Sequence, residues 1–255
     1  MSSIRVGTAG FVVPRERYLS RLRFVEIDLR APVPPPKTLA AWRRAAPEGF
    51  VFSAVAPESL FGERDWPLRD AAKTRSELDR FGNQLQALGA RIAVLRSPLG
   101  VSPGSVAFER FRPVLERARA LAPTLVWEPS GLWDHEEAVR VAEQFGAVVS
   151  GDPLQDEPGA AFAYARMRGL GTDQRYTMGR LEALAEALVD VDEAFVVFQS
   201  QQAWREAVGF AKLVGEIEAS GDDEELDEDD EELDDDDVDG SDDDDEEEDD
   251  EDGSE

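Results

Sequence analysis

Short β-favouring runs alternate with longer amphipathic runs over residues 1–220, and this alternation limits the fold more than any other feature of the chain. In the longer runs apolar residues recur at spacings of three and four, as Leu78, Phe81, Leu85 and Leu88 do. We expect helices at Arg69–Leu88, Phe108–Leu121, His135–Phe145, Gly179–Leu188 and Ala203–Glu218. We expect strands at Ile4–Ala9, Phe24–Leu29, Phe50–Val55, Ala90–Arg96, Thr124–Glu128, Ala147–Gly151, Phe162–Met167 and Ala194–Ser200.

Strands that alternate with helices imply right-handed βαβ units and a parallel sheet. Eight such units within residues 1–220 predict an α/β fold, a (β/α)8 TIM-like barrel at the short end of its size range. The helical run after the first strand is weak, and the run after the sixth is nearly absent. An open, doubly wound sheet is therefore the alternative.

The composition changes abruptly at Gly221. Residues 221–255 contain 27 acidic residues and no Lys or Arg, which leaves 29 acidic against 27 basic residues in 1–220. Because the segment repels itself and has little to bury, we expect a disordered Asp/Glu-rich tail at 221–255 after one barrel domain at 1–220. Such a tail can contact basic proteins, fold back as a lid over Arg96, Arg166 and Arg168, or serve only solubility.

Composition also disfavours several classes of protein. The chain has no Cys, and its single histidine, His135, is expected to be a solvated residue that opens a helix, so we expect no metal site of the zinc type and assign no cofactor. A nearly neutral body without a basic, aromatic-bearing strip predicts no nucleic-acid partner. No run reaches the roughly 18 apolar residues of a membrane span, and we expect a cytoplasmic protein.

Polar side chains gather at the carboxyl ends of the expected strands, where barrels of this type bind their ligands. Alternation along a strand places Glu26 and Asp28 on one face, with Val25 and Ile27 on the face that packs on helices. The charged and amide residues expected at this rim are Glu26, Asp28, Arg96, Glu128, Asp152, Arg166, Arg168 and Gln199.

Two interpretations of this rim remain open. In the functional one, Arg96 and Arg168 hold a small anionic ligand by paired hydrogen bonds. Asp28, Glu128 and Asp152 then act as acid or base, or hold a cation such as Mg²⁺. The other ligand-binding candidates are Glu26, Arg166 and Gln199. In the structural interpretation, the same charges form ion pairs that close the barrel mouth.

Motifs at successive strand ends carry a family resemblance. In the first half they are Ile4-Arg5-Val6-Gly7-Thr8-Ala9-Gly10-Phe11, Val25-Glu26-Ile27-Asp28 and Phe50-Val51-Phe52. In the second half they are Trp127-Glu128-Pro129-Ser130-Gly131, Gly151-Asp152-Pro153 and Tyr164-x-Arg166-Met167-Arg168-Gly169. In this order the motifs resemble the YecE-like family of TIM barrels, domain of unknown function seventy-two, over roughly residues 4–215. The resemblance implies the barrel fold.

The chain departs from the family pattern at polar positions. A Lys, an Arg and a His of that pattern correspond here to Val55, Ser130 and Arg168, and an Asn corresponds to Asp28. We therefore expect a degenerate ligand- or partner-binding module whose acidic tail contacts basic partners. The alternative is an enzyme that acts on a small anionic or sugar-like substrate through its strand-end carboxylates, with or without a divalent cation.

Overall fold

The computed structural model describes residues 3–30, 33–61, 68, 71–168 and 175–216. The expected tail at 221–255 lies outside the described residues. The strands are β1 (Ser3–Thr8), β2 (Phe24–Asp28), β3 (Val51–Val55), β4 (Ile92–Arg96), β5 (Thr124–Glu128), β6 (Ala147–Gly151), β7 (Phe162–Met167) and β8 (Glu193–Phe198). The helices are α1 (Arg15–Arg21), α2 (Pro36–Ala45), α3 (Ala71–Leu88), α4 (Val106–Ala118), α5 (His135–Gln144), α6 (Met178–Ala187) and α7 (Ala203–Leu213), with a 3₁₀ turn at Glu58–Leu60.

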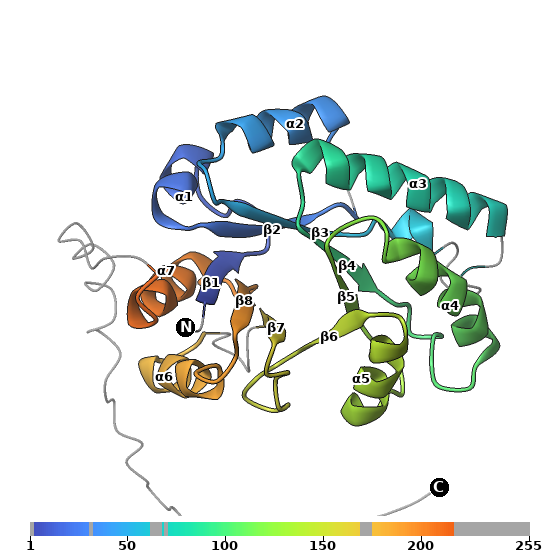
Figure 1. Cartoon of the computed structure of the whole chain (residues 1–255). Coiled ribbons are helices and arrows are strands. Elements are labelled where there is room, and N and C mark those ends of the chain that lie inside the picture. Colours follow the sequence, from blue (N-terminus) through green and yellow to red (C-terminus); the bar gives the residue numbers. More distant parts are fainter. Residues whose placement is uncertain (1–2, 31–32, 62–67, 69–70, 169–174, 217–255) are drawn as a thin grey trace, which may run out of the picture. The chain divides into compact units, whose positions relative to one another are not determined.

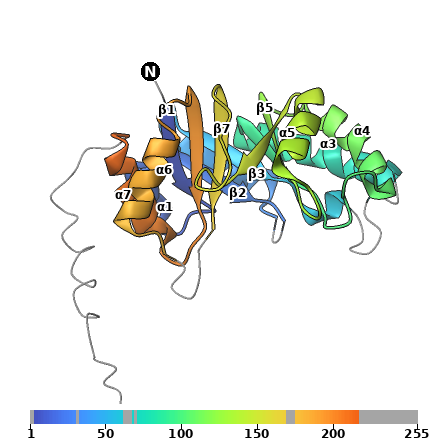
Figure 2. The same ribbon diagram turned by 90° about the horizontal axis from the view of Figure 1, so that it is seen from below.

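The strands form one parallel sheet in the order β1-β8-β7-β6-β5-β4-β3-β2, and the helices lie outside it (Figures 1 and 2). The two ends of this order meet, because Ala9 bridges Glu26 and the Gly10 N–H donates to the Glu26 carbonyl at 2.7 Å. The sheet therefore closes into a (β/α)8 barrel. The predicted fold is confirmed, and the open-sheet alternative is wrong.

Side chains bridge most of the junction between β1 and β2, which we call the seam. The Tyr18 hydroxyl accepts from the Thr8 N–H at 2.9 Å and donates to the Phe24 carbonyl at 2.9 Å. Two residues earlier along β1, the Glu216 carboxylate accepts a hydrogen bond from the Val6 N–H at 2.9 Å. Gly7 makes the close approach possible, since a Cβ there would lie 2.3 Å from the Phe24 carbonyl oxygen.

Residues alternate along each strand between two apolar cores. The outer core, between strands and helices, includes Val25 and Ile27, as the sequence predicts. The inner core lies inside the barrel and comprises Phe24, Val51, Val55, Ile92, Val94, Val126, Tyr164, Phe195 and Val197. Polar side chains end β2, β4 and β5, at Asp28, Arg96 and Glu128.

The connection from β6 to β7 departs most from a regular barrel. Residues 152–161, all of them described, contain no helix, and only Ser150↔Tyr164 and Gly151↔Ala165 pair in the β6–β7 ladder. Figure 1 shows a bare loop here, between α5 and α6. The near absence of a helical run after the sixth strand is confirmed, and it leaves the outer face of β6 only partly covered.

Candidate functional site at the carboxyl ends of the strands

A buried polar layer crosses the barrel just above the inner core. Glu26 is 0% exposed, and its Oε2 accepts a hydrogen bond from the Tyr164 hydroxyl at 2.8 Å. Ser53 Oγ lies 2.7 Å from the same hydroxyl. Burial raises the pKa of Tyr164 well above its ordinary value, with the neighbouring Glu26 charge adding to the effect, so the hydroxyl stays protonated and donates.

Arg166 joins this layer to the barrel mouth. Its Nη2 donates to Glu26 Oε1 at 2.7 Å, and its Nη1 donates to Glu128 Oε2. With its amide oxygen turned inward, Gln199 accepts from Arg166 Nε at 2.8 Å and from Nη2 at 2.9 Å. Burial lowers the pKa of Arg166, while the charge of Glu26 opposes the shift. Most donors of this buried guanidinium are therefore committed to the protein itself.

Glu128 lies among three guanidinium groups. Besides Arg166, Arg168 Nη2 donates to its Oε1, and Arg96 Nε lies 3.0 Å from the same oxygen. The Arg96 contact lacks hydrogen-bonding geometry, which leaves this Nε without a hydrogen-bond partner among the described residues. Burial lowers the pKa of Arg96, and the positive charges of Arg30 and Arg168 lower it further. Glu128 is thus in contact with three guanidinium groups, of which Arg166 is also paired with Glu26.

Asp28 is engaged by its own loop. Arg30 Nε lies 2.9 Å from Oδ1 and 2.8 Å from Oδ2 of Asp28, and the Arg30 N–H donates to Oδ1 at 2.9 Å. Burial acts to raise the pKa of Asp28, but the hydrogen bonds from Arg30 outweigh it and hold the pKa below its ordinary value. Asp28 is thus an ionised carboxylate paired with a guanidinium.

Asp152 shapes the turn after β6. Its Oδ1 accepts from the Leu154 N–H at 3.0 Å, and its Oδ2 accepts from Gln155 Nε2 at 2.8 Å. Both bonds lie within the 152–155 turn, so they fix the loop locally. No group of three His, Cys, Asp or Glu residues placed to hold a metal ion occurs in the described ranges.

Four of the predicted rim residues line one cavity of about 440 Å³, which we call the mouth cavity. They are Glu128, Asp152, Arg166 and Arg168. The other four predicted residues (Glu26, Asp28, Arg96 and Gln199) do not line it, and Glu26 is wholly buried. Alternation thus places polar residues toward the carboxyl ends of the strands, but it does not predict which of them face the cavity.

His135 differs from its predicted solvated position. It opens α5, as expected, but its side chain is half-buried, lines the mouth cavity and places Nδ1 3.7 Å from Asp156 Oδ1. Trp133 lines the same cavity and donates from Nε1 to the Val101 carbonyl at 2.6 Å. The cause is the missing helix after β6, because the loop that replaces it brings Asp156 next to the start of α5.

Some residues of this network are not among the predicted site residues. Tyr164 could have been found, because it shares a face of β7 with Arg166 in the two-residue alternation. Ser53 likewise alternates with Val51 and Val55 on the inner face of β3. No pattern distinguishes Arg30, whose position depends on the turn that follows Asp28.

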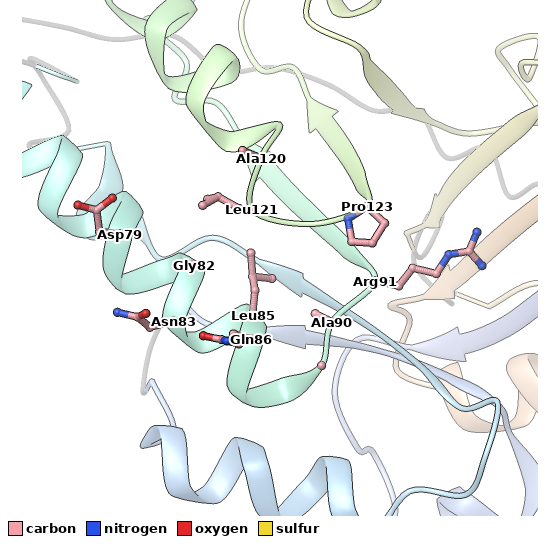
Figure 3. A pocket seen from close by; sticks show the side chains of 11 residues that line it. Asp79, Gly82, Asn83, Leu85, Gln86, Ala90, Arg91, Ala120, Leu121 and Pro123 are labelled. Atoms are coloured by element: carbon pink, nitrogen blue, oxygen red, sulfur yellow. The ribbon is translucent and has the colours of Figure 1, made fainter.

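A larger cavity of about 750 Å³ lies at the opposite end of the barrel, between α3 and the connection from α4 to β5 (Figure 3). Arg91 is its one cationic residue; it points away from Leu85 and Leu121 and pairs with Glu193 at 2.5 Å. Ligand sites of this fold form at the carboxyl ends of the strands. The mouth cavity is therefore the better candidate.

Within the described part of the chain, no helix combines the length and apolar character needed to cross a bilayer. Over residues 15–228 the sequence matches the model of a family described as "Protein of unknown function DUF72". No curated protein matches the chain.

Solved structures resemble the barrel over nearly their whole length. A DUF72 family protein from Enterococcus faecalis V583 is 15% identical with a TM-score of 0.66, and the match covers 84% of this chain and 98% of that one. A DUF72 family protein from Thermotoga maritima MSB8 is 20% identical with a TM-score of 0.64, covering 84% and 99%. A xylose isomerase domain protein from Planctomyces limnophilus is 11% identical with a TM-score of 0.57, covering 85% and 99%. At these identities the likeness shows the fold alone.

Proposed function

Since the chain belongs to the DUF72 family, whose description names no activity, we propose from the barrel mouth alone that it is a binding module for a small anionic ligand. The observation that carries the proposal is the crowding of three guanidinium groups around the single carboxylate of Glu128. Arg168 is 57% exposed on the wall of the mouth cavity. Arg96 lies behind this wall, with its buried Nε 3.0 Å from Glu128 but without a hydrogen-bond partner among the described residues. An anion there gains charge-assisted hydrogen bonds and relieves the repulsion between the two arginines.

The dimensions of the site suit this role. The mouth cavity, at about 440 Å³, falls within the range of roughly 300–1,000 Å³ that is usual for small-molecule sites. Its walls combine Arg166 and Arg168 with Trp133 and Pro129, and they also carry the carboxylates of Glu128, Asp134, Asp152 and Asp156, so a ligand meets charges of both signs and apolar surface.

Binding fits the carboxylates better than catalysis does. A general acid or base must reach the substrate and change its protonation state. Glu128 is held by guanidinium groups, Asp28 is paired with Arg30, and Asp152 is tied into its turn. No observation specifically favours the enzyme alternative, and the name of the xylose isomerase relative describes that protein only.

The proposal is tested by replacing the exposed guanidinium. In Arg168→Gln we expect the affinity for inorganic phosphate or a sugar phosphate to fall by about tenfold or more, because a charged hydrogen bond contributes roughly 1.5–3 kcal/mol. Wild-type protein at 100 times the Kd should gain about 2.7 kcal/mol of unfolding free energy. The shift in Tm measures this, with calorimetry for the Kd.

The matched control is Arg117→Gln, which removes the same charge from a side chain on α4 that is 53% exposed. It should bind phosphate as the wild type does. Equal losses in both variants would mean that only net charge matters, and a wild type that binds none of the tested anions would refute the proposal.

A further inference from the structure

An apolar groove lies on the outer wall of the barrel, where the missing helix of the β6–β7 unit would otherwise pack. Its volume is about 390 Å³. One side is formed by α5, through Val139 and Ala142, and the other by the loop at 156–161. Its floor is the outer surface of β6 and β7, which includes Val149 and Ala163. Every residue that lines the groove is among the described residues.

This groove adjoins the mouth cavity. Four residues line both spaces: His135, Val149, Gly151 and Asp156. Gly151 lies at their boundary, where a Cβ would be in contact with Asp156 Oδ2 at 3.3 Å and with His135 Cε1 at 3.5 Å. A ligand that displaces these two side chains can lie over the end of β6 and occupy both spaces at once.

The two spaces differ in chemistry. The mouth cavity is lined by Arg166 and Arg168 and by the carboxylates of Glu128, Asp134, Asp152 and Asp156, whereas the groove wall consists mainly of Val, Ala, Pro and Phe side chains. The groove has three carboxylates, those of Glu143, Asp156 and Glu157, and no Lys or Arg lines it. An anionic group therefore meets guanidinium groups only in the mouth cavity, which fixes the direction of a bound molecule.

From this arrangement we infer that the ligand is an anionic amphiphile, with a phosphate-like head on Arg168 and an unbranched hydrocarbon chain in the groove. The inference rests on the proposed function, because it places the head in the mouth cavity. It adds the class of ligand: apolar area buried in the groove contributes to affinity in proportion to chain length, whereas a small polar anion leaves the groove empty.

The test is a calorimetric titration of the full chain with methyl, butyl, octyl and decyl phosphate, each below its micellar concentration. We expect affinity to rise by about three- to fourfold for each methylene that enters the groove, and by at least about a hundredfold from butyl to decyl phosphate. Val139→Asp, which puts a charge on the groove wall, should remove most of this rise while leaving methyl phosphate binding unchanged. The control Val106→Asp alters an exposed valine on α4 that lines neither space, and should keep the rise.

The outcomes separate this inference from the proposed function. If methyl and decyl phosphate bind equally well and Arg168→Gln weakens both, the anion site stands and the amphiphile inference fails. If the rise with chain length persists in Val139→Asp, the chain does not bind in the groove, and the inference fails. If no alkyl phosphate binds, or Arg168→Gln leaves all affinities unchanged, the proposed function fails with it. The chain-length series on the wild type does not depend on the folding of any variant.

Discussion

The ionisable residues of the barrel differ in what compensates the cost of burying them. Glu26 and Arg166 neutralise each other, and their remaining polar atoms bond Tyr164, Gln199 and Glu128. Removing one partner from such a pair leaves a buried, uncompensated charge, which costs several kcal/mol. These interior residues therefore stabilise the folded barrel as well as contributing to the polar site at its mouth.

Glu216 is compensated less completely. Its Oε2 accepts from the Val6 N–H, but its Oε1 is buried without a hydrogen-bond partner in the described part of the chain. Burial raises the pKa of Glu216 from 4.5 to about 7, and the Val6 N–H, Arg5 and Arg23 only partly oppose this. The seam is thus closed by a carboxyl group that holds its proton more tightly in the folded chain than in the unfolded chain.

This difference predicts a dependence of stability on pH. Between about pH 4.5 and 7 the folded chain binds the extra proton, so the free energy of unfolding contributed by Glu216 decreases as pH rises through this window. The decrease amounts to at most about 3.5 kcal/mol, since one pKa unit corresponds to about 1.4 kcal/mol. We expect Glu216→Gln to remove it, as measured by urea unfolding at both ends of the window.

The control for this measurement is Glu109→Gln, at a side chain that is 62% exposed on α4. It should change the pH dependence little. Because the acidic residues of 221–255 are the same in all three proteins, their titration cancels in the comparison. A Glu216→Gln protein with the pH dependence of the wild type would show that Glu216 titrates normally.

At the level of elements, the close packing of β1 against β2 requires glycine at position 7. In Gly7→Ala the new Cβ would lie 2.3 Å from the Phe24 carbonyl oxygen, so β1 must move away from β2. We expect a loss of about 2 kcal/mol or more of unfolding free energy, as overpacking in a rigid core produces. The urea midpoint of the full chain measures it.

Gly179→Ala is the matched control for this substitution. A Cβ at this position in α6 meets nothing within 4 Å. Alanine there should stabilise the protein by roughly 0.4–1 kcal/mol, because it restricts the unfolded chain. If both alanine variants changed stability in the same direction, the close approach at the seam would not be what requires glycine.

The elements were predictable where the local pattern determines them. β5, β6 and β7 have the predicted bounds, because each is an apolar run flanked by turn residues. β8 ends at Phe198 rather than at Ser200, because the Ser200 hydroxyl accepts from the Gln202 N–H and bonds Glu206 at the start of α7. Such a bond depends on where the next helix begins, and strand periodicity does not contain that information.

The candidate site was less predictable than the fold. Alternation correctly places Glu26 and Asp28 on the face of β2 opposite Val25 and Ile27, and the strand ends place the predicted rim at the carboxyl end of the barrel. Which charges pair there depends on contacts such as that of Glu128 with Arg166, which is 38 positions away. The mouth cavity depends further on the loop after β6, whose path no periodicity encodes.

At the scale of the whole molecule, charge is divided very unevenly along the chain. Residues 1–220 are nearly neutral, whereas residues 221–255 carry 27 acidic groups. Any long-range attraction of this protein for a polycation therefore originates in the last 35 residues. The overall isoelectric point of about 4.3 therefore reflects this segment and not the barrel.

This division predicts where a basic partner binds. We expect fluorescent polylysine to bind the full chain, and to lose nearly all affinity when the Asp and Glu residues of 221–255 are replaced by Asn and Gln. Raising the salt concentration should weaken the wild-type interaction strongly, since charges are screened over about 8 Å at physiological ionic strength. Fluorescence anisotropy measures both effects. Affinity that survives the replacement would place the polycation site elsewhere.

The seam also affects how this protein can aggregate. A closed barrel presents no edge strand to other molecules, and that protects it from edge-to-edge aggregation. Here the protection of β1 depends on two side chains, because Tyr18 and Glu216 occupy the Thr8 and Val6 N–H groups that face β2. When either side chain moves away, β1 offers a bare backbone donor to any strand that meets it. Aggregation of this barrel would then begin at its first strand.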